Sequence, residues 1–231
     1  MIWQNATAMK SRLLAAVVLS MSLAAPCPLD AQDANAPRLE KRGAVTQLIV
    51  DGKPFLMLAG EFYNSSSSSL EYMKPLWPRL AAIPLNTVLT PLSWEIIEPI
   101  EGKYDFALID GLLAQAREHH LHVVFLWLAA WKNGMSSYPP VWVKQNTKRF
   151  PRVVLHNNEA NILSCIAGYS DATRDADARA FAAVMQHLRE VDSQNHTVLM
   201  MQVENEVGVL GDTRDHSAQA DQAFAAPSRY S

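Results

Sequence analysis

Four continuous apolar runs, each followed by a stretch with helical spacing, constrain the fold of this chain more than any other feature of its sequence. The runs lie near residues 55–60, 86–91, 122–128 and 197–204. Strands that read as unbroken apolar runs are buried on both faces, which is typical of parallel sheets covered by helices. The pattern therefore predicts an α/β fold with a parallel sheet built from about four β/α units.

The segments around these runs carry recognisable start and stop signals. Asp105 is a good N-cap for a helix that follows it. Pro75 and Pro78 are expected to divide the helical segment around them into short pieces. A longer helix is expected over about 175–191. Its apolar face is expected to consist of Ala178, Phe181, Met185, Leu188 and Val191.

The N-terminal residues have a different composition from the rest. Lys10 and Arg12 precede a short apolar stretch, which is followed by small and polar residues. This order is typical of a secretory signal peptide, and we expect it to cover 1–31. An uncleaved N-terminal anchor is the alternative. In either case an exported protein is expected, periplasmic or extracellular, with a short linker at 32–44 and one domain over 45–231. Within it, Asp51-Gly52 predicts a turn between two strands.

Charge and cysteine content exclude several classes of partner. The formal net charge is −3 with no basic stripe, so nucleic acid is not expected as a partner. Beyond the signal segment, no membrane association is expected. The two cysteines are Cys27 and Cys165, and no cluster of His and Cys has metal-ligand spacing. We therefore expect neither a metal nor another cofactor.

Polar and aromatic residues gather where the expected strands end. They are Tyr63, Trp94, Trp131, Asn205 and Glu206. Parallel α/β sheets and (β/α)₈ barrels carry their active sites at the carboxyl ends of their strands. Surface loops rarely contain so many large aromatic residues without a ligand or a packing partner. The sequence therefore predicts a site at this end of the sheet.

The stretch Glu204-Asn205-Glu206 at the end of the fourth run suggests the chemistry of that site. A glutamate among apolar and aromatic neighbours loses solvation, which raises its pKa and lets it protonate a leaving oxygen. An adjacent asparagine can hydrogen-bond a sugar hydroxyl, and exposed aromatic rings offer sugars a flat apolar face. Position and composition together favour glycoside hydrolysis.

Several motifs resemble glycoside hydrolase family 35, the β-galactosidases, in the clan of retaining (β/α)₈ glycosidases. LMMQVENEVG is similar to that family's QxENEYG motif, and LNTVLTPLSWEIIEPIEGKYDF is similar to its NTVxTYVPWNxHEPxxGxFDF. LAGEFYNS stands where the family has SGSIHYxR, and LHVVFLWLAAWKNGMSSYPPVWV resembles its third strand and the following loop. The matches keep their order over about 45–208. The resemblance implies a (β/α)₈ barrel of which the first half is present.

The resemblance also implies roles for the residues of the fourth strand. Glu206 would be the general acid/base, and Asn205 would bind the 2-hydroxyl of the sugar. Glu204 would face the same side as Glu206 if the strand stays regular to its tip, and would then support the site or bind sugar. Glu98 is expected to hold a loop rather than to touch substrate.

Other matching positions would form the walls of the sugar site. Tyr63 would line the galactose subsite, while Trp94 and Trp131 would shape the cleft, with Trp94 serving more as a structural wall. Two departures weaken the match to galactose bound in the usual way. Ala130 stands where the family has a glutamate that contacts galactose, and Phe62 stands where it has a histidine.

The resemblance predicts an enzyme that cleaves terminal β-galactosyl residues from oligo- or polysaccharides, plant cell-wall oligosaccharides among them, by a two-carboxylate mechanism. Within the family the nucleophile lies on the seventh strand, so this chain is expected to hold the acid/base but not the nucleophile, and to be inactive alone. One alternative is another retaining glycosidase of the clan, of the family 42 type or an endo-glycanase. A non-catalytic carbohydrate-binding or degenerate fragment is the alternative from a different class.

Overall fold

The computed structural model describes residues 35–156 and 165–227, all of which belong to one unit spanning Asp33–Ser231. The expected signal segment at 1–31 lies outside the described residues. Within the part of the chain that is described, no helix is both long and apolar enough to cross a bilayer.

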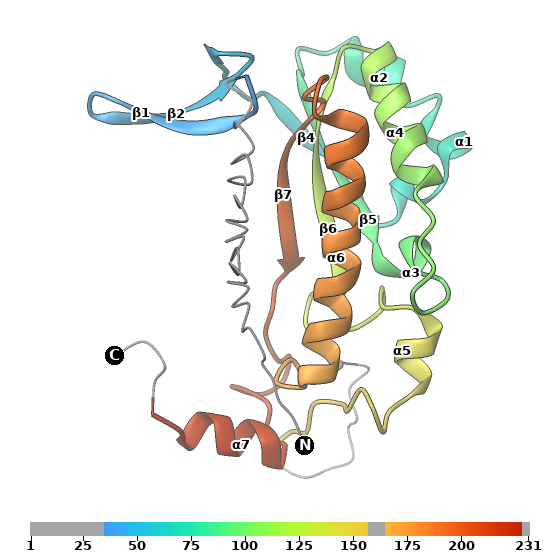
Figure 1. The fold of residues 1–231 in the computed structure, drawn as a ribbon, viewed down its shortest axis with the longest axis vertical. Coiled ribbons are helices and arrows are strands. Elements are labelled where there is room, and N and C mark those ends of the chain that lie inside the picture. The colour runs from blue at the N-terminus through green and yellow to red at the C-terminus, as the bar shows by residue number, and fades with distance from the viewer. Residues whose placement is uncertain (1–34, 157–164, 228–231) are drawn as a thin grey trace, which may run out of the picture. The chain divides into compact units, whose positions relative to one another are not determined.

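A parallel four-stranded sheet forms the centre of the fold (Figure 1). Its strands are β4 (Ala59–Glu61), β5 (Thr87–Ser93), β6 (His122–Lys132) and β7 (Val198–Asn205). They pair in the order β4-β5-β6-β7, which is also their order along the chain. Three strands lie where they were expected, whereas the first, expected near 55–60, is the short β4 at Ala59–Glu61. The expected α/β fold with a parallel sheet is confirmed.

The strands are connected by helices of very different lengths. These are α1 (Leu70–Met73), α2 (Trp77–Ala81), α3 (Trp94–Ile97), α4 (Ala107–Glu118), α5 (Val141–Gln145), α6 (Asp171–Asp192) and α7 (Ala218–Ala225), with a 3₁₀ turn at Ser66–Ser68. The separation of α1 from α2 confirms the effect expected of Pro75 and Pro78. Asp105 lies two residues before the helix expected to follow it, where its Oδ1 accepts a hydrogen bond from the Ala107 N–H at 2.9 Å.

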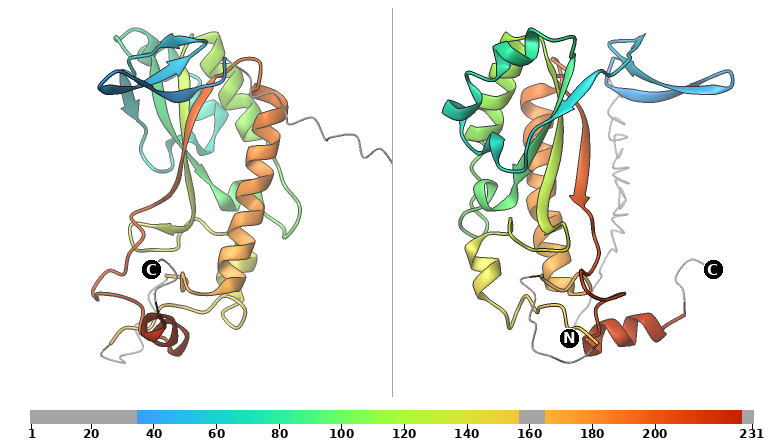
Figure 2. Two further views of the ribbon diagram at one scale, coloured as in Figure 1. Left: turned by 60° about the vertical axis from the view of Figure 1, so that its left-hand side comes forward. Right: turned by 180° about the vertical axis from the view of Figure 1, so that it is seen from behind.

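The two long helices α4 and α6 pack on one face of the sheet (Figures 1 and 2). Phe125 and Trp127 of β6 are fully buried against them. The opposite face of the same strand carries Val124, Leu126 and Leu128, which pack with residues of neighbouring strands and loops. Because side chains alternate along a strand, β6 is apolar on both faces, as the continuous apolar run predicted.

The buried face of α6 is only partly the one expected: Leu188 is buried, and Phe181 and Val191 pack against the core. The helix begins at Asp171, where Ser170 Oγ accepts a hydrogen bond from the Thr173 N–H, and its buried residues are Thr173, Ala176, Ala180, Val184, Leu188 and Asp192. Ala178 and Met185 are exposed. Alanines occur all around this helix, so hydrophobicity alone marks its face poorly. The small side chains at Ala176 and Ala180 let the helix approach the sheet closely.

A small antiparallel sheet precedes the parallel one. It consists of β1 (Arg38–Arg42), β2 (Val45–Val50) and β3 (Lys53–Pro54), in that order. Asp51 and Gly52 have φ values of 49° and 73°, the left-handed conformation of a tight hairpin turn, so the expected turn is confirmed. The strand β1 lies within the range expected to be a linker and was not predicted. Its residues are mostly charged, so hydrophobicity did not mark it as a strand.

Candidate active site

The tip of β7 is irregular. Glu204 and Glu206 have φ values of 60° and 51°, in the left-handed region that non-glycine residues seldom adopt. The pairing of β6 with β7 shifts register between Trp127 and Lys132. The regular strand that would place Glu204 and Glu206 on the same side is therefore absent. Each left-handed residue costs of order 1 kcal/mol, and such strain concentrates at functional sites.

Glu204 binds the backbone of the neighbouring strand. Its Oε1 accepts a hydrogen bond from the Ala130 N–H at 3.0 Å, and its Oε2 accepts one from the Trp131 N–H at 2.8 Å. These two peptide groups lie where the register shift interrupts the strand ladder, so the carboxylate replaces a missing backbone partner. Glu204 thus supports the site, which is one of the two roles considered for it.

Asp177 of α6 completes this arrangement and was not foreseen from the sequence. Its Oδ1 accepts a hydrogen bond from the indole Nε1 of Trp127 at 2.8 Å, and its Oδ2 accepts one from the Ala130 N–H at 3.2 Å. Burial raises the pKa of Glu204 far above its ordinary value. The hydrogen bond with Asp177 and the negative charge of Asp177 act in the same direction. The sequence signal that could have revealed this role was the position of an acidic residue between Ala176 and Ala180, on the helix face that packs against the sheet.

Asn205 is held by two side-chain amides. Its Nδ2 donates to Asn133 Oδ1 at 3.1 Å, and its Oδ1 accepts from Gln202 Nε2 at 2.9 Å. It is partly exposed, and its backbone pairs with Lys132 at the end of β6. The amide expected to bind a sugar hydroxyl is therefore fixed in orientation while its side chain remains accessible.

Glu206 lies just beyond the last residue of β7 and is exposed. We expected a glutamate at this tip to lose solvation, and the residue that does so is Glu204, two positions earlier. The reason is the left-handed conformation at Glu204, which breaks the alternation and turns that side chain inward against β6 and α6.

The aromatic residues of the expected cleft separate into three environments. Trp94 is fully buried, and its Nε1 donates to Glu98 Oε2 at 2.7 Å, consistent with a structural wall. Trp131 is 9% exposed and packs in a small apolar cluster that includes Val153 and Leu155. Tyr63 is 84% exposed and follows β4, two strands away from β6. The structure thus brings Trp131 and Glu204 together but leaves Tyr63 apart from them.

Two hollows lie at this end of the sheet. The first, of about 480 Å³, is lined by Trp131, Asp177 and Glu204 together with Gly168, Tyr169 and Arg214. The second, of about 390 Å³, is lined by Tyr63, Tyr72 and the serine run that begins at Ser65. Within the described ranges, no group of three or more His, Cys, Asp or Glu side chains is placed to hold a metal ion.

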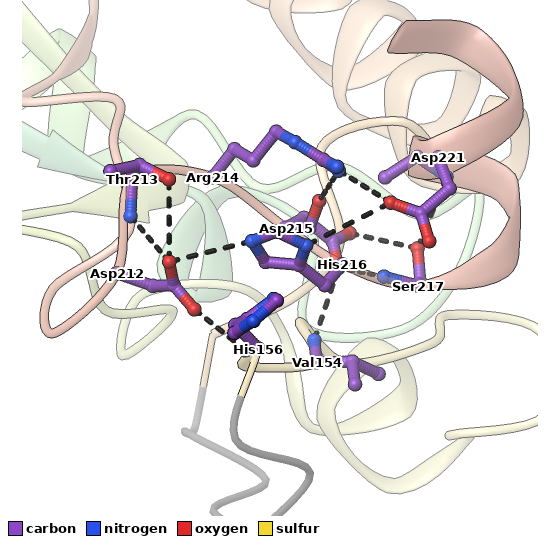
Figure 3. Close-up of polar contacts among 10 residues, drawn as sticks. Val154, His156, Asp212, Thr213, Arg214, Asp215, His216, Ser217 and Asp221 are labelled. Atoms are coloured by element: carbon purple, nitrogen blue, oxygen red, sulfur yellow. Dashed lines mark hydrogen bonds and ion pairs between the residues drawn. The ribbon is translucent and has the colours of Figure 1, made fainter. Parts of the chain in front are cut away.

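The segment that follows β7 is anchored by a polar cluster (Figure 3). The buried Asp215 accepts hydrogen bonds from the Val154 N–H at 3.1 Å and the Ser217 N–H at 2.8 Å. Asp212 accepts one from the His156 N–H at 2.6 Å, and this bond lowers the pKa of Asp212. The cluster ties the chain after β7 to residues 154–156 and so closes one side of the first hollow.

Comparison with known proteins places the chain in a family. The model of the glycoside hydrolase family 42 β-galactosidases matches residues 71–230, more than half of the chain. The chain belongs to this family. Family 42 was the alternative considered above, and family 35, which the motifs resemble, is not supported by this match. Both families belong to the clan of retaining (β/α)₈ glycosidases, so the Asn-Glu pair on the fourth strand does not distinguish them.

Two curated β-galactosidases are also similar to this family 42 chain. A β-galactosidase of Xanthomonas manihotis is 28% identical over 217 residues, which are 90% of this chain and 32% of the relative. β-Galactosidase 14 of Arabidopsis thaliana is 25% identical over 215 residues, which are 87% of this chain and 21% of the relative. The chain thus spans a third or less of the length of these curated relatives.

Solved structures share the fold of this family 42 chain. A polyextremophilic β-galactosidase from the haloarchaeon Halorubrum lacusprofundi matches with a TM-score of 0.55 and 20% identity, over 73% of this chain and 24% of that one. A catalytic mutant of a GH42 β-galactosidase from G. stearothermophilus matches with a TM-score of 0.52 and 20% identity, over 73% and 23%. The parallel sheet described here is therefore part of a (β/α)₈ barrel.

Proposed function

We propose that this chain is the first half of the catalytic barrel of an exported, retaining β-galactosidase that cleaves terminal β-galactosyl residues from oligo- or polysaccharides. The observation that carries the proposal is the place of Asn205 and Glu206, at the carboxyl end of the fourth parallel strand in a family 42 chain. In (β/α)₈ enzymes this end of the strands carries the catalytic residues.

In the proposed reaction Glu206 protonates the leaving oxygen and then removes a proton from the incoming water. Asn205, held by Gln202 and Asn133, hydrogen-bonds the 2-hydroxyl of the sugar, a contact that strengthens in the transition state. The nucleophile is a second carboxylate about 5 Å away, contributed from outside the four strands described here. The other half of the barrel and the bound sugar supply the desolvation that Glu206 lacks here.

The test is the leaving-group dependence of a Glu206→Gln variant of the complete enzyme. A proton donor matters most when the leaving group is a strongly basic alkoxide, which cannot depart without a proton. We therefore expect hydrolysis of a methyl β-galactoside or of lactose to fall by about 10²–10⁴-fold. Hydrolysis of a dinitrophenyl β-galactoside should fall far less in its first, bond-breaking step.

Glu95→Gln provides a matched control, because Glu95 also follows a strand end but forms a partly exposed ion pair with Lys144 at 2.9 Å. Its activity should stay within about threefold of the unmodified enzyme, since exposed ion pairs contribute little. Equal losses on both substrates for Glu206→Gln would remove Glu206 from the acid/base role.

Two alternatives remain testable in the same assays. Hydrolysis of long β-glucans in preference to aryl galactosides would favour an endo-glycanase. Binding of galactosides without turnover by the complete protein would favour a carbohydrate-binding protein. Export is tested by fractionating the native host and determining the N-terminal residue of the mature protein, which we expect to follow Ala31.

A further inference from the structure

Two carboxyl groups from distant parts of the chain meet at the end of β6. Asp177 Oδ2 and Glu204 Oε1 both accept a hydrogen bond from the same peptide N–H, that of Ala130, at 3.2 and 3.0 Å. Their remaining oxygens accept from Trp127 Nε1 and the Trp131 N–H. One amide hydrogen cannot compensate two adjacent, partly buried carboxylates, so such a pair retains a proton between its members.

The charged groups around the pair are engaged with partners of their own. Arg174, Arg214 and Asp215 line the same cavity. Arg174 forms ion pairs with Asp171 and Asp175, and Arg214 forms one with Asp221. Asp215 accepts hydrogen bonds from two peptide groups. A proton rather than an arginine therefore neutralises the second carboxylate.

The groups that this pair holds lie next to the proposed catalytic residues. Ala130 and Trp131 are the last residues of β6 before the strand pairs again, at Lys132, with Asn205. Glu204 itself immediately precedes Asn205. Fixing these peptide groups therefore fixes the point at which β7 delivers Asn205 and Glu206.

We propose that Asp177 and Glu204 share a single proton and act as a positioning pair for the tip of β7. The pair carries one negative charge, with the proton on one carboxyl donated to the other. Neither residue touches the reacting atoms in this arrangement. The contribution of the pair to catalysis rests on the proposed function, whereas the shared proton does not.

Infrared spectroscopy of the complete enzyme tests the shared proton. At about neutral pH an isolated carboxyl group is ionised. We expect the difference spectrum between the unmodified enzyme and Asp177→Asn to show the loss of one protonated carboxylic acid, because an asparagine amide can donate to Glu204 in place of the proton. Glu204→Gln should show the same loss. Asp175→Asn, on the exposed side of α6, should not.

Kinetics test the positioning role. Asp177→Asn keeps an acceptor for Trp127 and a donor for Glu204, so kcat should stay within about threefold of the unmodified enzyme. Asp177→Ala removes both and should lower kcat by about tenfold or more, because small displacements of a catalytic group are costly. KM should change by less than about threefold, since the ground-state contacts to sugar remain.

The two proposals can fail separately. If both variants lose the protonated-acid signal but the enzyme does not cleave β-galactosides, the shared proton is supported and the proposed function is wrong. No loss of that signal in either Asp177→Asn or Glu204→Gln would overturn the shared proton. Equal kcat values for Asp177→Ala and Asp177→Asn would overturn the positioning role, even if the signal is present.

Discussion

The indole Nε1 of Trp94 donates a 2.7 Å hydrogen bond to Oε2 of Glu98, one helical turn further along the chain, and both side chains are buried. The other carboxylate oxygen of Glu98 accepts from the Gly102 N–H at 2.7 Å. This carboxylate therefore accepts hydrogen bonds from a tryptophan side chain and from the backbone of a turn. Its contacts are those of a structural residue, as expected from the sequence.

Replacement of Glu98 by alanine should strongly destabilise the protein. The substitution leaves the buried Trp94 Nε1–H without an acceptor and removes the acceptor of the exposed Gly102 N–H, which we expect to cost about 2 kcal/mol of unfolding free energy. Denaturant titration measures this loss. Glu95→Ala, which breaks a partly exposed ion pair with Lys144, should cost less than about 1 kcal/mol. Similar losses for the two variants would show that the buried network contributes little.

The raised pKa of Glu204 makes stability depend on pH. Below the ordinary value of 4.5 the carboxyl group is protonated in both the folded and the unfolded chain, and pH has no effect through it. Above that value the unfolded chain releases the proton while the folded protein keeps it. The free energy of unfolding should therefore fall as pH rises, by up to about 1.4 kcal/mol per pH unit until the folded-state pKa is reached.

Denaturant titrations between about pH 6 and about pH 8 check this slope, because histidines are the main other groups that titrate there. Glu204→Gln should remove the contribution, since glutamine mimics the protonated acid and cannot ionise. His187→Gln serves as a comparison, because His187 hydrogen-bonds Asp110 far from the pair. A slope that persists unchanged in Glu204→Gln would assign it to other groups.

The amide of Asn133 should matter for catalysis through Asn205. Asn133 has a φ of 54°, so glycine at this position removes the amide without adding backbone strain. We expect Asn133→Gly to lower kcat on β-galactosides by about tenfold, because Asn205 loses the acceptor that orients it. Asn133→Asp keeps that acceptor and should stay within about threefold. Steady-state kinetics of the complete enzyme compare the two, and equal activities would contradict the role.

Gly111 in α4 should resist substitution because of Leu70. A Cβ atom added at Gly111 would overlap both Cδ atoms of Leu70 and lie 3.0 Å from its Cγ, so the whole side chain must shift and Gly111→Ala should destabilise by about 1 kcal/mol despite the better helix propensity of alanine. In a Leu70→Ala background the obstruction is gone, and the same change should stabilise by up to about 1 kcal/mol. Denaturant titration of the four proteins gives the coupling. An unchanged effect in both backgrounds would exclude the clash.

The sequence predicted those parts of the molecule that local patterns specify. The strands β5 and β6 are continuous apolar runs, and the turn at Asp51 and Gly52 has a short, distinctive signature, so all three were found. The strand β1 carries charged residues on an exposed hairpin and left no such pattern. The face of α6 was misassigned only in part, because alanine is compatible with both sides of a helix.

The candidate site shows the same division. The positions of Asn205 and Glu206 at a strand tip followed from the end of an apolar run. The desolvated carboxyl group was expected at the tip but is Glu204, because a left-handed residue redirects the strand. Asp177 lies 50 residues from its partner Trp127, and nothing local announces that they meet. Contacts between distant segments depend on tertiary packing, which local patterns do not encode.

The order of strands in the parallel sheet, which repeats their order along the chain, has a consequence for biosynthesis. Each strand pairs with the one translated immediately before it, so no strand waits on the ribosome for a partner that has yet to be made. The connections from β4 to β5 and from β5 to β6 are much shorter than the one from β6 to β7, but the entropic cost of closing a loop grows only slowly with its length. The sheet can therefore grow strand by strand during translation, with β7 adding to an edge of β6 that already exists.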